Sequence, residues 1–288
     1  MLAGYFALLI AALDLANVRA GVEIMTVAVI AAAVVITRKP AEFVRDWWFL
    51  LLGLVMWNLS GPVAAHSPFP AHLDFMWRID RILFAGHDPV YILQHSLLHP
   101  GHVGPLDVAT AVAYNMHLPE PYLAGYFLWR LDRTIYLQFA ACVLVLLVSG
   151  FVTFILFPAI PPWLAALRYG KVVGVVNQFG PVLRAHPLPF HGTPIFYVFK
   201  LSGDPIAAFP SEHAAFPLLE LLAFRLCAPR WVAAILACWV AWVLFTVVYL
   251  GEHWVTDAIA GYVYAVAIFA AVRWLCRPSD VRLGTAVG

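Results

Sequence analysis

The chain contains 288 residues, of which 63% are hydrophobic and 11% are charged, and its formal net charge at pH 7 is +1. Soluble domains carry about a quarter charged residues, so this composition excludes an ordinary soluble protein and predicts one that crosses a membrane several times. The nearly neutral charge gives no reason to expect nucleic-acid binding. The cysteines lie in apolar segments without metal-ligand spacing, which favours reduced packing residues over disulfides: Cys142, Cys227, Cys238 and Cys276.

Eight apolar segments, each near the ~20 residues that span a bilayer, predict an all-α polytopic membrane helical bundle with about eight transmembrane helices. The first has neither a basic start nor a small-residue cleavage site, which favours a retained span over a signal peptide. The segments cover residues 3–18, 21–37, 46–66, 106–129, 135–157, 212–228, 231–250 and 254–275.

Two long connections, 67–105 and 158–211, are rich in proline, histidine and aromatic residues and lack a clean spanning pattern. Within the first, residues 73–97 mix aromatic and aliphatic side chains with charged ones, which predicts an amphipathic helix at the membrane interface. We therefore divide the chain into N-terminal transmembrane helices, an interfacial and extracytoplasmic segment, a main bundle and a cytoplasmic tail, in residues 1–66, 67–105, 106–276 and 277–288.

Basic residues follow the second, fourth, sixth and eighth apolar segments, mostly in very short loops. Because positively charged short loops are retained in the cytoplasm, both termini are predicted to be cytoplasmic and both long connections to lie outside. We expect an integral protein of the plasma (cytoplasmic) membrane. The residues are Arg38, Lys39, Arg45, Arg130, Arg133, Arg225, Arg230, Arg273, Arg277 and Arg282.

Two motifs place a histidine at the outer edge of an apolar segment. In the first, Pro210 and Ser211 form a helix-start signal, and His213 falls in the first turn, where free N–H groups and the helix dipole favour a phosphate. In the second, Asp257 lies four residues after His253, so on a helix it can reach the imidazole and fix its tautomer. A histidine held in this way can act as a nucleophile, and a second histidine can protonate a departing alkoxide. The alternative is a polar pair packed inside the bundle, but ionisable groups in membrane segments are expensive and tend to mark function.

Other polar residues leave two interpretations open. The apolar segment 106–129 carries several polar residues and is interrupted by Pro119 and Pro121. These polar residues either line a headgroup pocket or have a structural role. They are Asp107, Tyr114, Asn115, His117 and Glu120. Glu220 is seven residues after His213, on nearly the same helix face, and belongs to the site or makes a structural hydrogen bond. His95, His99 and His102 lack nearby carboxylates or cysteines at ligand spacing, so we expect interfacial histidines and no metal.

The two motifs resemble the second and third signatures of the type 2 phosphatidic acid phosphatase superfamily. Residues 157–163, Phe-Pro-Ala-Ile-Pro-Pro-Trp, resemble a segment of its inositol phosphorylceramide synthase-like branch, as do Asp107, Tyr114, His117 and Pro121. The resemblance covers roughly residues 75–272. It implies a six-helix phosphatase-like core and makes 106–276 a catalytic lipid phosphatase or phosphotransferase bundle.

The resemblance also implies a phosphohistidine mechanism without cofactor or metal. His253 attacks phosphorus, Asp257 orients it, and His213 protonates the leaving oxygen and later activates the acceptor. The chain departs from the superfamily in lacking the first signature, a lysine followed six residues later by Arg-Pro, and in carrying Val247 where an arginine is expected. The remaining candidates for substrate or phosphate binding are Ser211 and Glu220, the branch residues Asp107, Tyr114 and His117, and the outer cations Arg168, Lys171, Arg184 and Lys200. Each of these cations alone also fits a lipid-headgroup contact at the interface.

These observations predict an integral membrane enzyme that cleaves a lipid phosphoester at the extracytoplasmic face. The missing cations and the branch favour transfer of a phospho-headgroup, such as phosphoinositol, to a lipid alcohol. The alternative is a plain phosphatase acting on a lipid monoester or pyrophosphate. A second alternative, a non-enzymatic transporter or scaffold, fits less well because both histidines and the aspartate are present. The expected partners are a lipid phosphate substrate and the bilayer, with no nucleic acid.

Overall fold

The structure is a computed structural model that describes residues 30–31, 34–35, 40–64, 67–99, 102–117, 119–180, 182 and 206–276. The predicted first span, most of the second, the tail 277–288 and the candidates Arg184 and Lys200 lie outside these residues. Within them every named element is a helix, and extended backbone pairs only at isolated bridges. The predicted all-α class is confirmed for this part of the chain.

Three helices are long and apolar enough to cross a membrane: α8 (Arg133–Leu156), α13 (Arg230–Tyr249) and α14 (Val255–Leu275). They coincide with three predicted spans and make the chain a membrane protein. A further helix of 25 residues, α3 (Pro40–Ala64), packs along α8. The predicted total of eight spans is untested, because the first two segments lie mainly outside the described residues.

The predicted proline break divides one membrane segment into two short helices. α6 (Pro105–Met116) ends just before His117, and α7 (Glu120–Leu131) starts after Pro119, which occupies its N-cap. Proline cannot donate a backbone hydrogen bond, so a continuous helix is disfavoured here. The break brings the polar residues at the junction into the interior of the bundle, where His117 and Glu120 are both buried.

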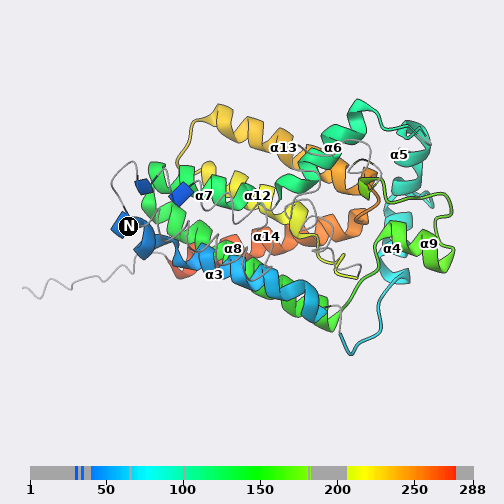
Figure 1. Ribbon diagram of the computed structural model, residues 1–288, viewed down its shortest axis with the longest axis horizontal. Coiled ribbons are helices and arrows are strands. Elements are labelled where there is room, and N and C mark those ends of the chain that lie inside the picture. The colour runs from blue at the N-terminus through cyan, green and yellow to red at the C-terminus, as the bar shows by residue number, and fades with distance from the viewer. Residues whose placement is uncertain are drawn as a thin grey trace, which may run out of the picture.

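The central helix of the bundle is α12 (Glu212–Phe224), which packs against α7, α8, α13 and α14 (Figure 1). Its 13 residues extend only about 20 Å, less than the thickness of a bilayer core. Ser211 caps it as predicted, because its Oγ accepts from the Ala214 N–H at 3.3 Å. The first turn of α12, which carries His213, therefore lies inside the bundle.

α14 approaches this first turn through a glycine. A Cβ added at Gly261 would clash with the backbone oxygen of Ser211, and it would also lie 3.5 Å from the Ala215 nitrogen. At the same contact between the two segments, the Ser211 N–H donates a hydrogen bond to the Asp257 carbonyl oxygen at 3.0 Å. Only glycine lets the starts of the two histidine-bearing segments pack this closely.

Three short helices gather at the end of the bundle where α12 and α14 begin (Figure 1). They are α4 (Asp74–Leu83), α5 (Pro89–Leu97) and α9 (Pro162–Tyr169). The single helix expected over 73–97 is thus two helices, because Ala85 and Gly86 adopt positive φ and Asp88 with Pro89 starts a new helix. α4 is amphipathic as predicted: Met76 and Asp80 are buried, whereas Phe75, Ile82 and Leu83 are exposed.

The opposite end of the bundle carries the basic residues of the short loops. Arg133 opens α8 and Arg230 opens α13, and Arg273 lies in the last turn of α14. There Asp46 accepts from Arg133 Nε and Nη2 at 2.6 and 2.7 Å and from Arg45 Nε at 2.9 Å. The histidine motifs and these cations therefore lie at different ends of the helices.

Substituting Gly261→Ala tests the close approach of α14 to α12. The methyl group must displace the Ser211 carbonyl, and overpacking of this kind costs about 1–3 kcal/mol. We expect a lower thermal unfolding temperature in detergent together with reduced activity. Ala267→Val, on an exposed face of the same helix, is the control. Unchanged stability in the Gly261 variant would contradict the packing described here.

Candidate active site

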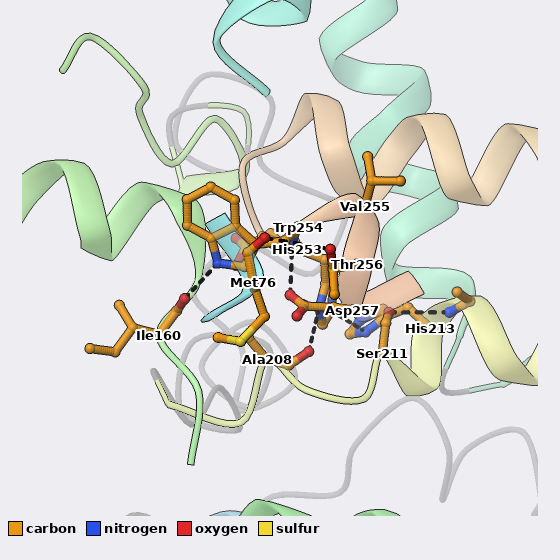
Figure 2. Close-up of polar contacts among 12 residues, drawn as sticks. Met76, Ile160, Ala208, Ser211, His213, His253, Trp254, Val255, Thr256 and Asp257 are labelled. Atoms are coloured by element: carbon orange, nitrogen blue, oxygen red, sulfur yellow. Dashed lines mark hydrogen bonds and ion pairs between the residues drawn. The ribbon is translucent and has the colours of Figure 1, made fainter. Parts of the chain in front are cut away.

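The two predicted histidines meet between the starts of α12 and α14. Figure 2 shows His253 and His213 joined by a dashed line, with His253 Nε2 at 3.2 Å from His213 Nδ1. Both rings are buried, 5% and 9% exposed. The imidazoles converge as the two motifs predict, but at direct hydrogen-bond distance, so a phosphorus atom can enter between them only if the rings separate.

The tautomer of His253 is set chiefly by a backbone group. His253 Nδ1 lies 2.9 Å from the Ala208 carbonyl oxygen, which can only accept a hydrogen bond. Nδ1 therefore carries the hydrogen and Nε2 carries the lone pair that faces His213. This is the protonation state that a nucleophilic Nε2 requires.

The Ala208 carbonyl is held in place by three extended segments that are far apart in the chain. The His72 N–H donates to the Pro158 oxygen at 2.7 Å, and the Ala159 N–H donates to the Ile206 oxygen at 2.7 Å. The Ala208 N–H then donates to the Ala159 oxygen at 3.3 Å, which fixes the orientation of residue 208. Nothing in the local sequence marks this contact, because any residue supplies a carbonyl.

Asp257 is fully buried beside His253 and has two roles in the geometry. Its Oδ2 lies 3.6 Å from His253 Nδ1, an ion-pair distance, and accepts from the Trp254 N–H at 2.8 Å. The second contact closes the first turn of α14. The predicted proximity at i and i+4 is therefore present, while the shorter contact to Nδ1 comes from Ala208.

Asp80 of α4 is a site residue that the sequence does not single out. It is fully buried, and its oxygens accept from the Val255 and Thr256 N–H groups at 2.9 and 2.8 Å and from Thr256 Oγ1 at 2.6 Å. These donors belong to the first turn of α14, directly after His253. Burial raises the pKa of Asp80, and the three hydrogen bonds act in the opposite direction. Its position in an amphipathic helix, with a charge on the buried face, is the one signal present in the sequence.

The side chains of Tyr114 and His117 pack against the His213 ring. The His213 ring stacks on the Tyr114 ring with centroids 4.2 Å apart. The centroid of the His117 ring lies 3.7 Å from that of the His213 ring. His117 Nδ1 is 2.8 Å from the Tyr114 carbonyl, which fixes the orientation of that ring. The break between α6 and α7 thus delivers two of the candidates to the site.

The turn between α13 and α14 is tied to the neighbouring loops. Glu252 accepts from Trp163 Nε1 at 3.1 Å and from Asn177 Nδ2 at 2.9 Å, and the Trp163 N–H donates to the Gly251 oxygen at 3.1 Å. Gly251 has φ of 76°, and a Cβ there would lie 2.8 Å from the Val176 oxygen. The segment 157–163 therefore lies directly against the histidine motif.

A family model of the PAP2 superfamily matches residues 74–271. The chain belongs to the PAP2 superfamily. This match contains both histidine motifs, the broken helix and α4.

Two curated relatives refine the placement within the superfamily. The phosphoinositol dihydroceramide synthase of Bacteroides thetaiotaomicron is 30% identical over 199 residues, 67% of this chain and 64% of the relative. The inositol phosphorylceramide synthase catalytic subunit of Saccharomyces cerevisiae is 30% identical over 124 residues, 42% of this chain and 30% of the relative. The chain thus spans less than two thirds of either relative's length. Their names confirm the inositol phosphorylceramide synthase-like branch of the PAP2 superfamily, and no solved structure matches the chain.

The structure shows why the superfamily arginine has no counterpart at position 247. Val247 is fully buried on α13 in a cluster with Val90, Val175 and Val243. A guanidinium group placed there would enter this apolar cluster at a large desolvation cost. Any positive charge for a phosphate must reach this site from another position.

The predicted cations in the described part of the chain lie on the surface. Arg168 is exposed on α9, and Lys171 Nζ lies 3.3 Å from Asp74 Oδ1 and 4.5 Å from the centre of the Trp77 ring. Neither makes a hydrogen bond or ion pair with the histidines among the described residues. Their contacts fit the interfacial interpretation, while Lys200 falls outside the described residues.

Two of the predicted carboxyl candidates have different surroundings. Asp107 is fully engaged, because Oδ1 accepts from Tyr249 OH at 2.6 Å and from Gln178 Nε2 at 3.2 Å, while Oδ2 accepts from the Gly104 N–H at 2.7 Å. Glu220 is buried on α12, and its Oε1 has no hydrogen-bond partner among the described residues. The structure therefore gives Asp107 a role in holding α6 and α13 together.

Glu252 provides a test of the electrostatics around His253. Burial raises the pKa of Glu252 from 4.5 to about 7, opposed by His253 and by the hydrogen bonds from Trp163 and Asn177. Because the folded pKa is higher than the unfolded value, the fold favours the protonated acid, and stability contributed by this group falls as pH rises from about 4.5 to about 7. We expect the unfolding temperature of Glu252→Gln, measured relative to that of the wild type, to increase as the pH rises over this window. A constant difference between pH 5 and 8 would contradict the assignment.

Asp80 variants test whether α4 positions the start of α14, which follows His253. Asp80→Ala leaves the buried N–H groups of Val255 and Thr256 without their acceptor, and each unsatisfied group costs about 1–3 kcal/mol. We expect a large drop in kcat with a smaller change in KM, and partial recovery in Asp80→Asn, which retains one acceptor oxygen. Asp88→Ala, which removes the side-chain acceptor at the N-cap of α5, is the matched control. Equal effects of the Asp80 and Asp88 substitutions on kcat would show that Asp80 has no special role.

Proposed function

We propose that this chain is a membrane phosphotransferase that moves a phospho-headgroup from a donor lipid to a lipid alcohol through a phosphohistidine on His253. The observation that carries the proposal is the buried contact of His253 Nε2 with His213 Nδ1, with Ala208 fixing the opposite nitrogen of His253. The PAP2 superfamily and the synthase names of both relatives support the same reaction class. A polyol phosphate such as phosphoinositol is the headgroup that the relatives' names favour.

The proposed reaction has two balanced steps. First, His253 Nε2 attacks phosphorus, the bond from phosphorus to the donor lipid oxygen breaks, and protonated His213 gives its proton to that oxygen. Second, the hydroxyl oxygen of the acceptor attacks phosphorus, its proton passes to His213, and the bond from phosphorus to Nε2 breaks. Asp257 stabilises the charged imidazole in each step, and Ala208 keeps Nδ1 protonated.

The proposed site lies on the extracytoplasmic side of the membrane, with both termini in the cytoplasm. The supporting observation is the separation of the histidines from Arg133, Arg230 and Arg273 along the helices. A donor and an acceptor that both reside in the outer leaflet can then reach His213 and His253 laterally. We place the protein in the plasma (cytoplasmic) membrane.

Substituting His253→Ala removes the proposed nucleophile, and His213→Ala removes the proton donor. We expect each to reduce transfer by at least about 10³-fold while the protein remains folded, because proton transfer alone contributes about 10²–10⁴. Activity is measured as movement of a labelled headgroup onto a lipid alcohol in detergent. His95→Ala, on α5, is the control. Retention of more than a tenth of the activity in His253→Ala would contradict a covalent route through this residue.

A plain phosphatase would use the same two histidines, so only the reaction products distinguish it from the transferase. With a phosphodiester donor, the transferase produces a new lipid phosphodiester only when a lipid alcohol is supplied. A phosphatase acting on a monoester releases inorganic phosphate without one. If the wild type releases only inorganic phosphate and moves no headgroup to diacylglycerol or to an N-acylated amino alcohol, the protein is a phosphatase and the proposed transfer is wrong.

A further inference from the structure

The His213 ring is held in a different way from the His253 ring. His253 Nδ1 faces the Ala208 carbonyl oxygen at 2.9 Å and Asp257 Oδ2 at 3.6 Å. His213 Nδ1 faces His253 Nε2 at 3.2 Å, and its Nε2 is buried without a hydrogen-bond partner in the described part of the chain. Among the described residues no carboxylate lies at ion-pair distance from His213, so none offsets a proton on this ring.

The proposed first step nevertheless places a positive charge on His213, because the ring gives its proton to the leaving oxygen. Burial disfavours the charged form of an imidazole, and this ring is only 9% exposed. The rings of His117 and His253 have centroids 3.7 and 5.1 Å from that of His213, and neither carries negative charge. The substrate phosphate supplies negative charge only after it has bound. A neighbour that favours the imidazolium in the free protein would therefore assist the reaction.

The ring of Tyr114 has the geometry that this role requires. Its plane is nearly parallel to that of His213, at 17°, with the centroids 4.2 Å apart, so the imidazole lies over the face of the phenol ring. The face of an aromatic ring is negative and attracts a cation within about 6 Å of its centroid. Tyr114 lies in the last turn of α6, just before the break, and its ring also contacts Phe179 at 5.0 Å between centroids.

We propose that Tyr114 is a positioning residue that stabilises the protonated form of His213 through the face of its ring. The inference rests on the proposed function, in which His213 is the proton donor. The phenol ring takes the place of the carboxylate that His253 has in Asp257 and that His213 does not have among the described residues. The ring face carries this role and the hydroxyl does not, so phenylalanine at this position should preserve it.

Titration of His213 in the free protein tests the stabilisation without any turnover. NMR of ring-labelled histidines in detergent follows each imidazole, and the His213 signal is assigned by its loss in His213→Ala. Tyr114→Leu removes the ring face, and we expect the titration midpoint of His213 to fall by about one pH unit, the shift that a cation–π contact of ordinary strength produces. An equal midpoint in the wild type and Tyr114→Leu would overturn the proposal. So would a wild-type His213 that stays neutral down to about pH 5, because its imidazolium would then have no stabilising partner.

Single-turnover release of the donor lipid alcohol connects this effect to the proposed first step. Above its midpoint His213 loses its proton tenfold per pH unit, so Tyr114→Leu should slow release about tenfold at pH 8 and less than about twofold at pH 5. A loss by the same factor at every pH is what a purely structural role gives, and it would overturn the proposal. A difluorinated phenylalanine at position 114 keeps the shape but weakens the negative face, so its loss should lie between those of Tyr114→Phe and Tyr114→Leu. Phe179→Leu, which removes another ring contact of Tyr114, is the matched control.

The two measurements separate this proposal from the proposed function. A lower midpoint in Tyr114→Leu with unchanged release at pH 8 would retain the effect of Tyr114 on the ring and reject His213 as the proton donor. An unchanged midpoint in a protein that transfers the headgroup would reject the role of Tyr114 and retain the proposed function. A loss in Tyr114→Phe as large as that in Tyr114→Leu would also overturn the proposal, because it would assign the effect to the hydroxyl group.

Discussion

The hydrogen bond from His253 Nδ1 to the Ala208 carbonyl is the interaction on which the account of the site depends. It decides which nitrogen of the imidazole carries a lone pair and directs that nitrogen toward His213. The carbonyl is placed by backbone contacts among residues 72, 158–160 and 206–208, and α14 is placed by Asp80. Residue 72 and α4, which precede the main bundle in the chain, therefore help to orient the His253 ring, the proposed nucleophile.

A membrane bundle normally excludes polar side chains, and here local irregularities admit them. The break between α6 and α7 exposes His117 and Tyr114 to His213, and the short α12 starts within the bundle. Gly150 and Gly261 let α8 and α14 close on the first turn of α12. Irregular backbone at membrane depth is tolerated where it faces protein, and here it faces the site.

The features that follow from the sequence are local. Ser211 as an N-cap, the proline break at residues 119–121 and the proximity of Asp257 to His253 each depend on residues within four positions of one another. The contacts of Asp80 with Thr256 and of Ala208 with His253 join residues far apart in the chain, and an aspartate or an alanine does not by itself indicate which residue it will contact. The helix expected over 73–97 divides in two because Ala85 and Gly86 adopt positive φ. Gly86 and the Asp88–Pro89 helix start are visible in the sequence, whereas an alanine rarely adopts positive φ.

The most direct measurement is the chemical identity of the phosphorylated residue after rapid quenching of the enzyme with a donor lipid. Tandem mass spectrometry and ³¹P NMR distinguish phosphorylation at the two imidazole nitrogens. With Nδ1 held by Ala208, the account predicts phosphate on Nε2 of His253. Phosphate on His213, or on Nδ1 of His253, would contradict it.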